Sequence, residues 1–136
     1  MFISETTSRV RYGETDQMGY MYHGNYAQYY ETGRVEALRQ LGTSYKALED
    51  EGVMMPVLEI KSKFIKPAKY DDLITIRTML RNLPTARVQF EFELYNESRE
   101  LIHTAEVQLV FVRSSDMRPI RCPEWLYQLF ETNFEK

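Results

Sequence analysis

Hydrophobic and polar residues alternate along four stretches in the second half of the chain, the pattern of β-strands with one buried face. These stretches are residues 57–65, 73–81, 87–95 and 101–112. Short turn-like segments separate them, so adjacent strands are expected to pair antiparallel. A fifth run with the same period, residues 7–12, stops at Gly13 and predicts a first strand near the N-terminus.

Between the first strand and the other four, the hydrophobic period changes to three and four residues, which predicts an amphipathic helix over residues 25–41. Asn25 and Gln28 are expected to form a capping pair at its start, and Gly42 suits the position after its last residue. Gly33, in the middle, lowers helix stability by about 1 kcal/mol relative to alanine. Its presence predicts that the helix backbone approaches another element closely there.

Two shorter helices, over residues 45–51 and 123–134, complete the predicted elements. A sheet with one apolar face needs a cover, and the helix over residues 25–41 is the one long enough to supply it. The sequence therefore predicts an α+β fold in which an antiparallel sheet curls around a central helix. The end of the last strand, residues 109–112, is apolar on both faces, so oligomerisation is expected to cover it.

Composition narrows the class of protein. The 136 residues fit one domain, residues 1–136, with an ordinary hydrophobic core. The chain carries 17 Lys and Arg against 20 Asp and Glu, a net charge of −3, which argues against a general nucleic-acid binder. Cys122 is the only cysteine, so no intramolecular disulfide can form, and a cytoplasmic location is expected. The sequence predicts no signal peptide and no membrane span.

Candidate chemistry gathers in the loop between the first strand and the central helix, residues 12–26. A helix N-terminus offers unpaired N–H groups, so the amide near His23 or Gly24 could bind a carboxylate, a phosphate or a developing oxyanion. If a turn at Gly19 folds the loop back, the Asp16 carboxylate would lie beside those donors as a base or nucleophile. The alternative is that Asp16 only bonds the backbone of its own turn.

The same loop carries an extended motif. It reads Tyr12-x-Glu14-Thr15-Asp16-x-Met18-Gly19-x-x-x-His23-x-x-Tyr26-x-x-Tyr29 and continues into Glu31 and Arg34. This motif closely resembles the N-terminal signature of the 4-hydroxybenzoyl-CoA thioesterase family, of the YbgC-like kind. The segment Pro67-Ala68-x-Tyr70-Asp71-Asp72 resembles that family's turn between its second and third strands. The resemblance covers nearly the whole chain in the order of its elements.

The resemblance implies the hotdog fold, in which a five-stranded antiparallel sheet wraps a long helix, and the hydrolysis of acyl-CoA thioesters without a cofactor. It implies that Asp16 is the catalytic carboxylate and that the backbone amide of His23 donates to the thioester oxygen. It also implies a homodimer or homotetramer, with the acyl-CoA lying across an interface between subunits.

Thioester hydrolysis suits a site of this size. A thioester carbonyl is more electrophilic than that of an oxygen ester, and a thiol with a pKa near the roughly 8.5 of cysteine leaves as a thiolate without a strong acid. A carboxylate and a hydrogen-bond donor therefore suffice. Asp16 could attack the carbonyl and form a mixed anhydride, or it could activate water as a general base, and the sequence leaves both roles open.

Further residues are expected to contact the substrate: Tyr20, Tyr22, Gly24, Tyr26 and Glu31. Half of the 10 tyrosines lie between positions 20 and 30, where they either line the acyl pocket or, at helical spacing, belong to the core. The His23 ring either polarises the thioester or packs within the loop. Glu31 either supports the site or pairs with Arg34, three residues further on.

Other charged residues allow two interpretations. The local basic cluster, formed by Lys61, Lys63, Lys66 and Lys69, either meets the phosphates of coenzyme A or forms a solvated strand face. The two histidines, His23 and His103, are 80 residues apart without accompanying cysteines or paired carboxylates, so no metal site is expected.

Two alternative functions stay open. A thioesterase acting on acyl carrier protein would use the lysine cluster as a docking surface. A non-catalytic acyl-binding hotdog subunit would not need Asp16, so the presence of this residue argues against it. A hotdog dehydratase fits less well, because its catalytic histidine and acid would occupy other positions.

Overall fold

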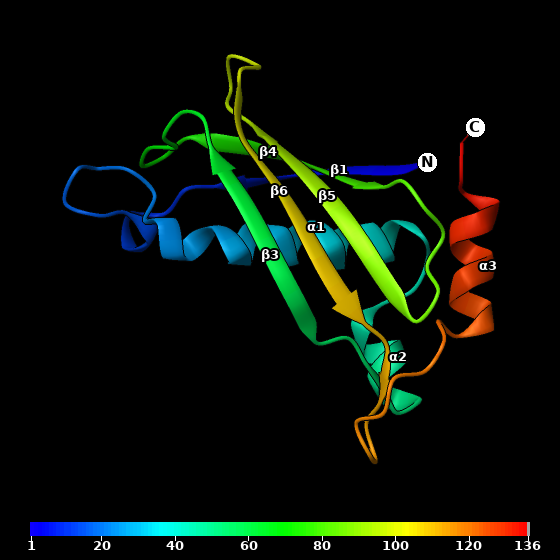
Figure 1. The fold of residues 1–136 in the computed structure, drawn as a ribbon. Coiled ribbons are helices and arrows are strands. Elements are labelled where there is room, and N and C mark those ends of the chain that lie inside the picture. Colours follow the sequence, from blue (N-terminus) through cyan, green and yellow to red (C-terminus); the bar gives the residue numbers. More distant parts are fainter. Residues whose placement is uncertain (136) are drawn as a thin grey trace.

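The computed structural model describes residues 1–135. A five-stranded antiparallel sheet curves around the long helix α1 (Tyr26–Gln40), as Figure 1 shows. Its strands are β1 (Phe2–Arg9), β3 (Val57–Phe64), β4 (Leu73–Leu80), β5 (Arg87–Tyr95) and β6 (Leu101–Val110). The remaining elements are α2 (Tyr45–Asp50), α3 (Glu124–Thr132), the paired short strands β2 (Val53–Met54) and β7 (Val112–Arg113), and 3-10 turns at Tyr12–Glu14 and His23–Asn25. This is the predicted hotdog arrangement, and the α+β prediction is confirmed.

The strands lie in the order β1-β4-β5-β6-β3, and each pair is antiparallel. The short connection between β3 and β4 therefore does not make them neighbours, contrary to the expectation from the sequence. The connection instead runs past the loop that precedes α1, where the Met21 N–H donates to the Ala68 carbonyl (2.7 Å) and the Val10 N–H to the Asp72 carbonyl (2.9 Å). Held by these bonds, the β3–β4 connection leads from the edge strand β3 to the other side of the sheet, where β4 pairs with β1.

Gly33 marks the closest approach of α1 to the sheet. A Cβ atom at this position would lie 2.5 Å from Thr78 Oγ1 and 2.9 Å from Ile76 Cγ2, both on β4. The inner faces of β4 and β5 supply the other side of the core, with Ile74, Leu80, Phe90 and Leu94 buried there. The close approach predicted from the glycine is confirmed, because a larger residue would force the helix away from the sheet.

The first strand differs from its prediction. β1 begins at Phe2 and ends at Arg9, and it pairs with β4 from Phe2↔Leu80 to Arg9↔Leu73. Residues 12–14, predicted to lie at the end of the strand or just after it, form a 3-10 turn. The prediction of residues 7–12 was wrong at both ends because β1 contains few apolar residues, and its pairing with β4 rather than its own pattern defines it.

The ends of the central helix are partly as expected. Gly42 adopts a positive φ of 89° after the last turn, as a glycine in the position after a helix does. The predicted capping pair is absent from the described residues: the Asn25 side chain donates to the Glu14 carbonyl at 2.9 Å, away from the first turn of the helix. Asn25 therefore ties the helix to the preceding loop instead of capping it.

The exposed apolar surface of the sheet lies on the edge strand β3 and not at the end of β6. Leu109, Val110, Phe111 and Val112 are all buried within the chain, so the expectation that oligomerisation covers them was wrong. The exposed apolar residues lie on β3, where Leu58, Ile60 and Phe64 are 49, 43 and 53 % exposed. β6 is the one neighbour of β3 in the described part of this sheet, so its other edge is unpaired.

Helix α3 lies beside the N-terminal end of β1, so the two ends of the chain are close together (Figure 1). The rings of Phe2 and Phe130 pack edge to face, with centroids 5.9 Å apart. In residues 1–135, no helix combines the length and the apolar character needed to cross a membrane.

Candidate functional site

The loop that carries Asp16 folds back on itself in front of α1. The Asp16 N–H donates to the Tyr20 carbonyl at 2.8 Å, and Thr15 and Met21 form an antiparallel bridge. Gly19 closes the turn with a positive φ of 76°. The loop therefore makes the turn at Gly19 that was expected from the sequence.

The Asp16 carboxylate stabilises this turn and keeps one oxygen available. Its Oδ1 atom accepts from the Met18 N–H at 2.8 Å and, more weakly, from the Tyr20 N–H at 3.3 Å. Within residues 1–135, Oδ2 has no hydrogen-bond partner. The turn interpretation of Asp16 is thus correct for one oxygen, and it leaves the other free to act on a ligand.

The start of the helix lies close by. The 3-10 turn His23–Asn25 runs directly into α1, and the N–H groups of His23 and Gly24 donate to no acceptor within the described residues. Unpaired donors of this kind are what a helix N-terminus presents to an anion. The His23 ring packs against Tyr22, with centroids 4.4 Å apart, and is exposed.

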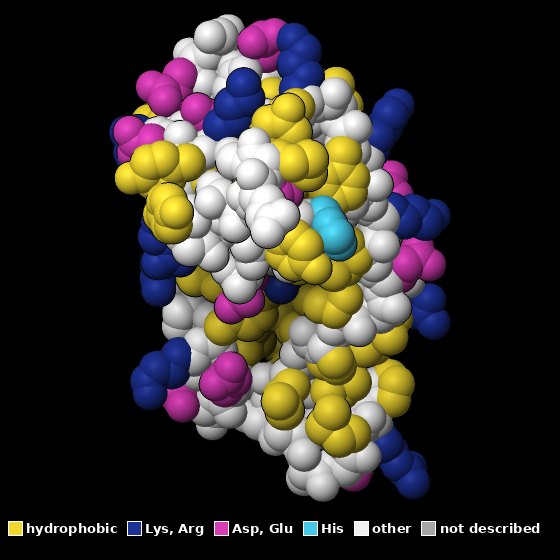
Figure 2. Space-filling view, turned by 90° about the vertical axis from the view of Figure 1, so that its left-hand side faces the viewer, with side chains coloured by type: hydrophobic (Ala, Val, Ile, Leu, Met, Phe, Trp, Pro, Cys, Tyr) yellow, Lys and Arg dark blue, Asp and Glu magenta, His cyan; other side chains and the backbone are white. Residues whose placement is uncertain are grey.

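Asp16 and His23 line one cavity of ≈ 350 Å³. Tyr20, Tyr26, Phe64 and Lys66 also contribute to its wall, so the loop, the helix start and the end of β3 all meet here. Figure 2 views this end of the molecule and shows hydrophobic side chains gathered around a surface histidine. The cavity therefore combines a carboxylate and a helix N-terminus with a largely apolar wall.

The other predicted contact residues divide into two groups. Tyr20 and Tyr26 line the cavity, whereas Tyr22, Gly24 and Glu31 do not. Gly24 packs against the ring of Tyr22: a Cβ atom there would lie 2.6 Å from Tyr22 Cε2. Tyr22 and Gly24 thus flank His23 at the start of the helix but do not line the cavity.

The predicted pair between Glu31 and Arg34 is absent from the described residues. Arg34 is buried, and its Nε atom donates to the Tyr45 hydroxyl at 3.2 Å. Glu31 is exposed on α1. The interpretation of these two residues as a simple ion pair was therefore wrong, because α2 brings a closer partner to Arg34.

Two of the tyrosines serve the core. Tyr29 and Tyr30 are 2 and 1 % exposed, and each finds a polar partner for its hydroxyl: Glu14 Oε1 at 3.0 Å for Tyr29, and Ser62 Oγ at 2.7 Å for Tyr30. The helical spacing of these tyrosines indicated the core interpretation, which is confirmed for them. Tyr26 belongs to both groups, since it is buried and also lines the cavity.

Sequence reasoning missed His103. This residue is fully buried on β6 and stacks against Tyr26, with centroids 4.3 Å apart, and it meets Phe64 edge to face at 4.7 Å. Burial lowers the pKa of His103 to about 4, so its ring is neutral near pH 7. His103 thus lies directly behind two aromatic walls of the cavity, and no sequence signal indicated this because the contact joins distant segments.

The lysine cluster is split between two places. Lys61 and Lys63 lie on the face of the sheet away from α1, where they are exposed. Lys66 lines the Asp16 cavity and pairs with Glu100. Lys61 and Lys63 therefore line the outer face of the sheet and Lys66 lines the Asp16 cavity, so these three lysines do not share one cavity.

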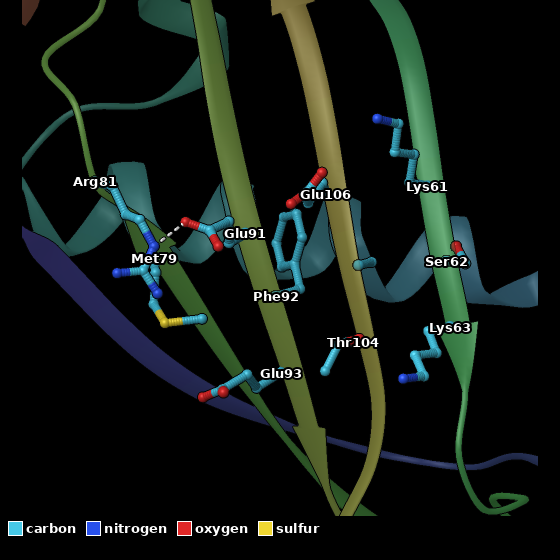
Figure 3. Close-up of a pocket in the computed structure, with 11 residues that line it drawn as sticks. Lys61, Ser62, Lys63, Met79, Arg81, Glu91, Phe92, Glu93, Thr104 and Glu106 are labelled. Atoms are coloured by element: carbon cyan, nitrogen blue, oxygen red, sulfur yellow. Dashed lines mark ion pairs between the residues drawn. The ribbon is translucent and has the colours of Figure 1, made fainter.

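A second cavity, of ≈ 330 Å³, lies on that outer face of the sheet. Figure 3 shows Arg81, Glu91, Glu106 and Lys61 projecting from it, with an ion pair between Arg81 and Glu91. Its walls come from strands and from Arg81, with no helix N-terminus among them. The charges of this cavity are largely balanced by their neighbours, so the candidate site is the Asp16 cavity.

Two further groups carry no site. Within residues 1–135, no three or more His, Cys, Asp or Glu side chains gather closely enough to hold a metal ion. Cys122 is buried, and burial raises the pKa of its thiol to about 12, which keeps it protonated and unreactive.

Comparison with known proteins gives consistent matches over almost the full chain. The family model described as "Thioesterase-like superfamily" matches residues 10–130. A putative acyl-CoA thioesterase, YneP of Bacillus subtilis, is 32% identical over 129 residues, which cover 92% of this chain and 94% of that protein. The acyl-CoA thioester hydrolase YbgC of Escherichia coli is 32% identical over 123 residues, covering 90% and 92%. A crystal structure of a DHNA-CoA thioesterase from Staphylococcus aureus superposes with a TM-score of 0.91 at 31% identity, covering 97% of this chain and 91% of that one.

Proposed function

The chain belongs to the Thioesterase-like superfamily and is a thioester hydrolase, and we propose that it hydrolyses acyl-CoA thioesters to a carboxylic acid and free coenzyme A. The relatives named as acyl-CoA thioesterases support this choice of substrate. The observation that carries the proposal is the position of Asp16 and His23 on one cavity.

Asp16 is the proposed catalytic carboxylate. Its Oδ1 atom is occupied by the Met18 N–H, which fixes the direction of the carboxylate, and its Oδ2 atom faces no competing donor in the described residues. The free amide of His23 is proposed to hold the thioester oxygen as negative charge develops on it. Removal of one such donor typically lowers transition-state stabilisation by about 2.7 to 4 kcal/mol.

Two chemical routes are open to Asp16. As a nucleophile, it attacks the carbonyl carbon, the C–S bond breaks, coenzyme A leaves as a thiolate, and water then hydrolyses the acyl-aspartyl anhydride. As a general base, it removes a proton from a water molecule that attacks the carbonyl directly. A single turnover in H₂¹⁸O identifies the anhydride route if ¹⁸O appears in Asp16, through attack of water on the aspartyl carbonyl, because a general base places ¹⁸O only in the product acid.

The working unit is proposed to be a dimer formed through β3. This strand has an unpaired edge in the described sheet, and it exposes Leu58, Ile60 and Phe64. An exposed, apolar edge strand is a template for pairing with a second chain. Because Phe64 also lines the Asp16 cavity, a partner subunit seated on β3 would border the site.

The test is a panel of short, long and aromatic acyl-CoAs, with the same acyl groups on acyl carrier protein, assayed with the wild type and Asp16→Asn. Asparagine keeps the shape of the side chain and its acceptor for the Met18 N–H, so the fold should persist while kcat falls by about 10²- to 10⁴-fold. Asp50→Asn, at an exposed carboxylate on α2, is the matched control and should hydrolyse at the wild-type rate.

Three outcomes would change the assignment. Turnover at the wild-type rate in Asp16→Asn would remove Asp16 from the mechanism. Hydrolysis of acyl carrier protein thioesters alone would show that the acyl group is carried by acyl carrier protein and not by coenzyme A. A wild type that binds acyl-CoA without hydrolysing any member of the panel would indicate a binding subunit.

A further inference from the structure

Glu14 is a buried carboxylate to which the proposed mechanism gives no role. It is 8 % exposed, and it lies at the end of the 3-10 turn Tyr12–Glu14, two residues before Asp16. A charged side chain is buried at a cost, so its partners identify what it stabilises.

The side chain of Glu14 connects the start of the loop to the central helix. Its Oε1 atom accepts from the Arg11 N–H at 2.8 Å and from the Tyr29 hydroxyl at 3.0 Å. Tyr29 is itself buried one turn inside α1, and burial, together with the adjacent Glu14 carboxylate, raises its pKa, so the hydroxyl keeps its proton. The guanidinium of Arg11 lies 3.7 Å away but is highly exposed, so it adds little.

The backbone of Glu14 connects the end of the loop to the same helix. Its carbonyl accepts from the Tyr22 N–H at 2.8 Å and from Asn25 Nδ2 at 2.9 Å. Tyr22 directly precedes the two free amides, and Asn25 directly follows them. One residue thus joins four points: both ends of the Asp16 loop, the start of the helix and the first buried turn of α1.

We propose that Glu14 is a positioning residue for the thioesterase site, which sets the distance between the Asp16 carboxylate and the amide of His23. This inference rests on the proposed function. Asp16 is connected to α1 through the Glu14–Tyr29 hydrogen bond on one side and through the Glu14–Tyr22 backbone bond on the other. Loss of the first connection lets the loop shift relative to the helix, and a shift of about 1 Å is enough to lower a rate by about 10²-fold.

The chain offers a matched control for the Tyr29 hydroxyl. Tyr95 donates to Glu93 Oε1 at the same distance, 3.0 Å, on β5. Tyr29→Phe and Tyr95→Phe therefore delete the same tyrosine–glutamate bond, once beside the Asp16 loop and once away from it. Tyr29→Phe should lower kcat by about 10-fold or more with KM within about twofold. Tyr95→Phe should leave both constants unchanged.

Variants of Glu14 separate positioning from simple stability. Glu14→Gln keeps an acceptor for the Arg11 N–H and the Tyr29 hydroxyl, so it should retain much more activity than Glu14→Ala. In an Asp16→Asn background, Glu14→Ala should add almost no further loss, because a residue that acts through Asp16 has nothing left to position. Full activity of folded Tyr29→Phe, or additive losses in the double variant, would overturn the proposal.

A structural readout keeps this test independent of the proposed activity. Hydrogen exchange at the Met18 amide, which is bonded to Asp16, should accelerate in Tyr29→Phe and stay unchanged in Tyr95→Phe. If the wild type hydrolyses no thioester, the proposed function fails, yet this exchange still decides whether Glu14 holds the loop. Unchanged exchange in Tyr29→Phe would count against the positioning role.

Discussion

The Tyr30 hydroxyl is hydrogen-bonded to Nε2 of His103 in the interior of the protein, although 73 residues separate the two positions. The same hydroxyl bonds Ser62 Oγ at 2.7 Å, so one polar chain links α1, β6 and the edge strand β3. The other ring nitrogen of His103, Nδ1, has no partner among the described residues. Burial in this position disfavours the protonated imidazolium, so the pKa of His103 falls to about 4.

The free energy of unfolding should fall as the solution is acidified from about pH 6.5 to about pH 4. In this window the unfolded chain binds a proton at His103, whose pKa there is near its usual 6.5, while the folded chain, with the pKa lowered to about 4, does not. Stability is therefore fully present above about pH 6.5 and declines by up to about 3 kcal/mol on the way to pH 4. Denaturant melts at a series of pH values measure this slope.

His103→Phe supplies the control for the pH dependence. This variant removes the titrating ring, so the part of the slope due to His103 should disappear even if the overall stability also changes. An equally steep decline in His103→Phe would assign the acid sensitivity to carboxylates instead.

Gly33→Ala should destabilise the fold, although alanine is the better helix former. The new Cβ would meet Thr78 Oγ1 at 2.5 Å and Ile76 Cγ2 at 2.9 Å, and overpacking of this kind typically destabilises by about 1–3 kcal/mol. Thermal unfolding measures the change. In Gly13→Ala, no other part of the protein lies within 4 Å of the added methyl group, so its free energy of unfolding should lie within about 0.5 kcal/mol of that of the wild type. A Gly33→Ala variant as stable as Gly13→Ala would show that α1 can move away from β4 freely.

Gly24→Ala should lower activity without an equivalent loss of stability. Its Cβ would lie 2.6 Å from the ring of Tyr22, which is partly exposed and can move. That ring packs on His23, so its displacement should shift the helix start by a fraction of an ångström and reduce kcat/KM by about 10-fold. Steady-state kinetics combined with a thermal melt test this expectation. Unaltered kcat/KM would show that Tyr22 and Gly24 do not influence the proposed site.

Ile60→Glu should separate the proposed dimer into monomers. Ile60 is 43 % exposed on the edge strand, and a buried carboxylate at an apolar interface is strongly unfavourable. Light scattering after size-exclusion chromatography gives the mass directly. Met117→Glu, at another exposed apolar residue outside β3, should keep the wild-type mass. A monomeric wild type would contradict the interface through β3.

The quality of the element predictions follows the strength of the local pattern. The strand over residues 87–95 is recovered with both boundaries, because Val88, Phe90 and Leu94 alternate strictly with polar residues. The first strand was misplaced because it contains few apolar residues, and its partner β4 determines where it begins and ends. The β3–β4 relationship was also wrong, since strand order depends on how the connecting segment crosses the molecule and not on its length.

The candidate site shows the same division. Asp16 and His23 belong to a motif within one loop, which predicts their role from the sequence, and the structure brings both to one cavity. That Phe64 and Lys66 complete the wall could not be predicted, because the end of β3 and the start of the β3–β4 connection bring them beside a loop that lies far earlier in the chain. Glu14 lay within the motif, but its role became visible only with its bond to Tyr29, which needs the helix in place.

The sequence by itself determined the alternating strands, the central helix, the glycine that lets this helix approach the sheet, and the loop that carries the acid. These features depend on interactions between residues close in the chain, and such interactions leave a period or a motif. Tertiary structure alone decided the order of the strands, the exposed edge of β3, the neutral state of His103 and the four connections made by Glu14. Each of these depends on contacts between distant segments, and only the packing of the sheet around α1 brings those segments together.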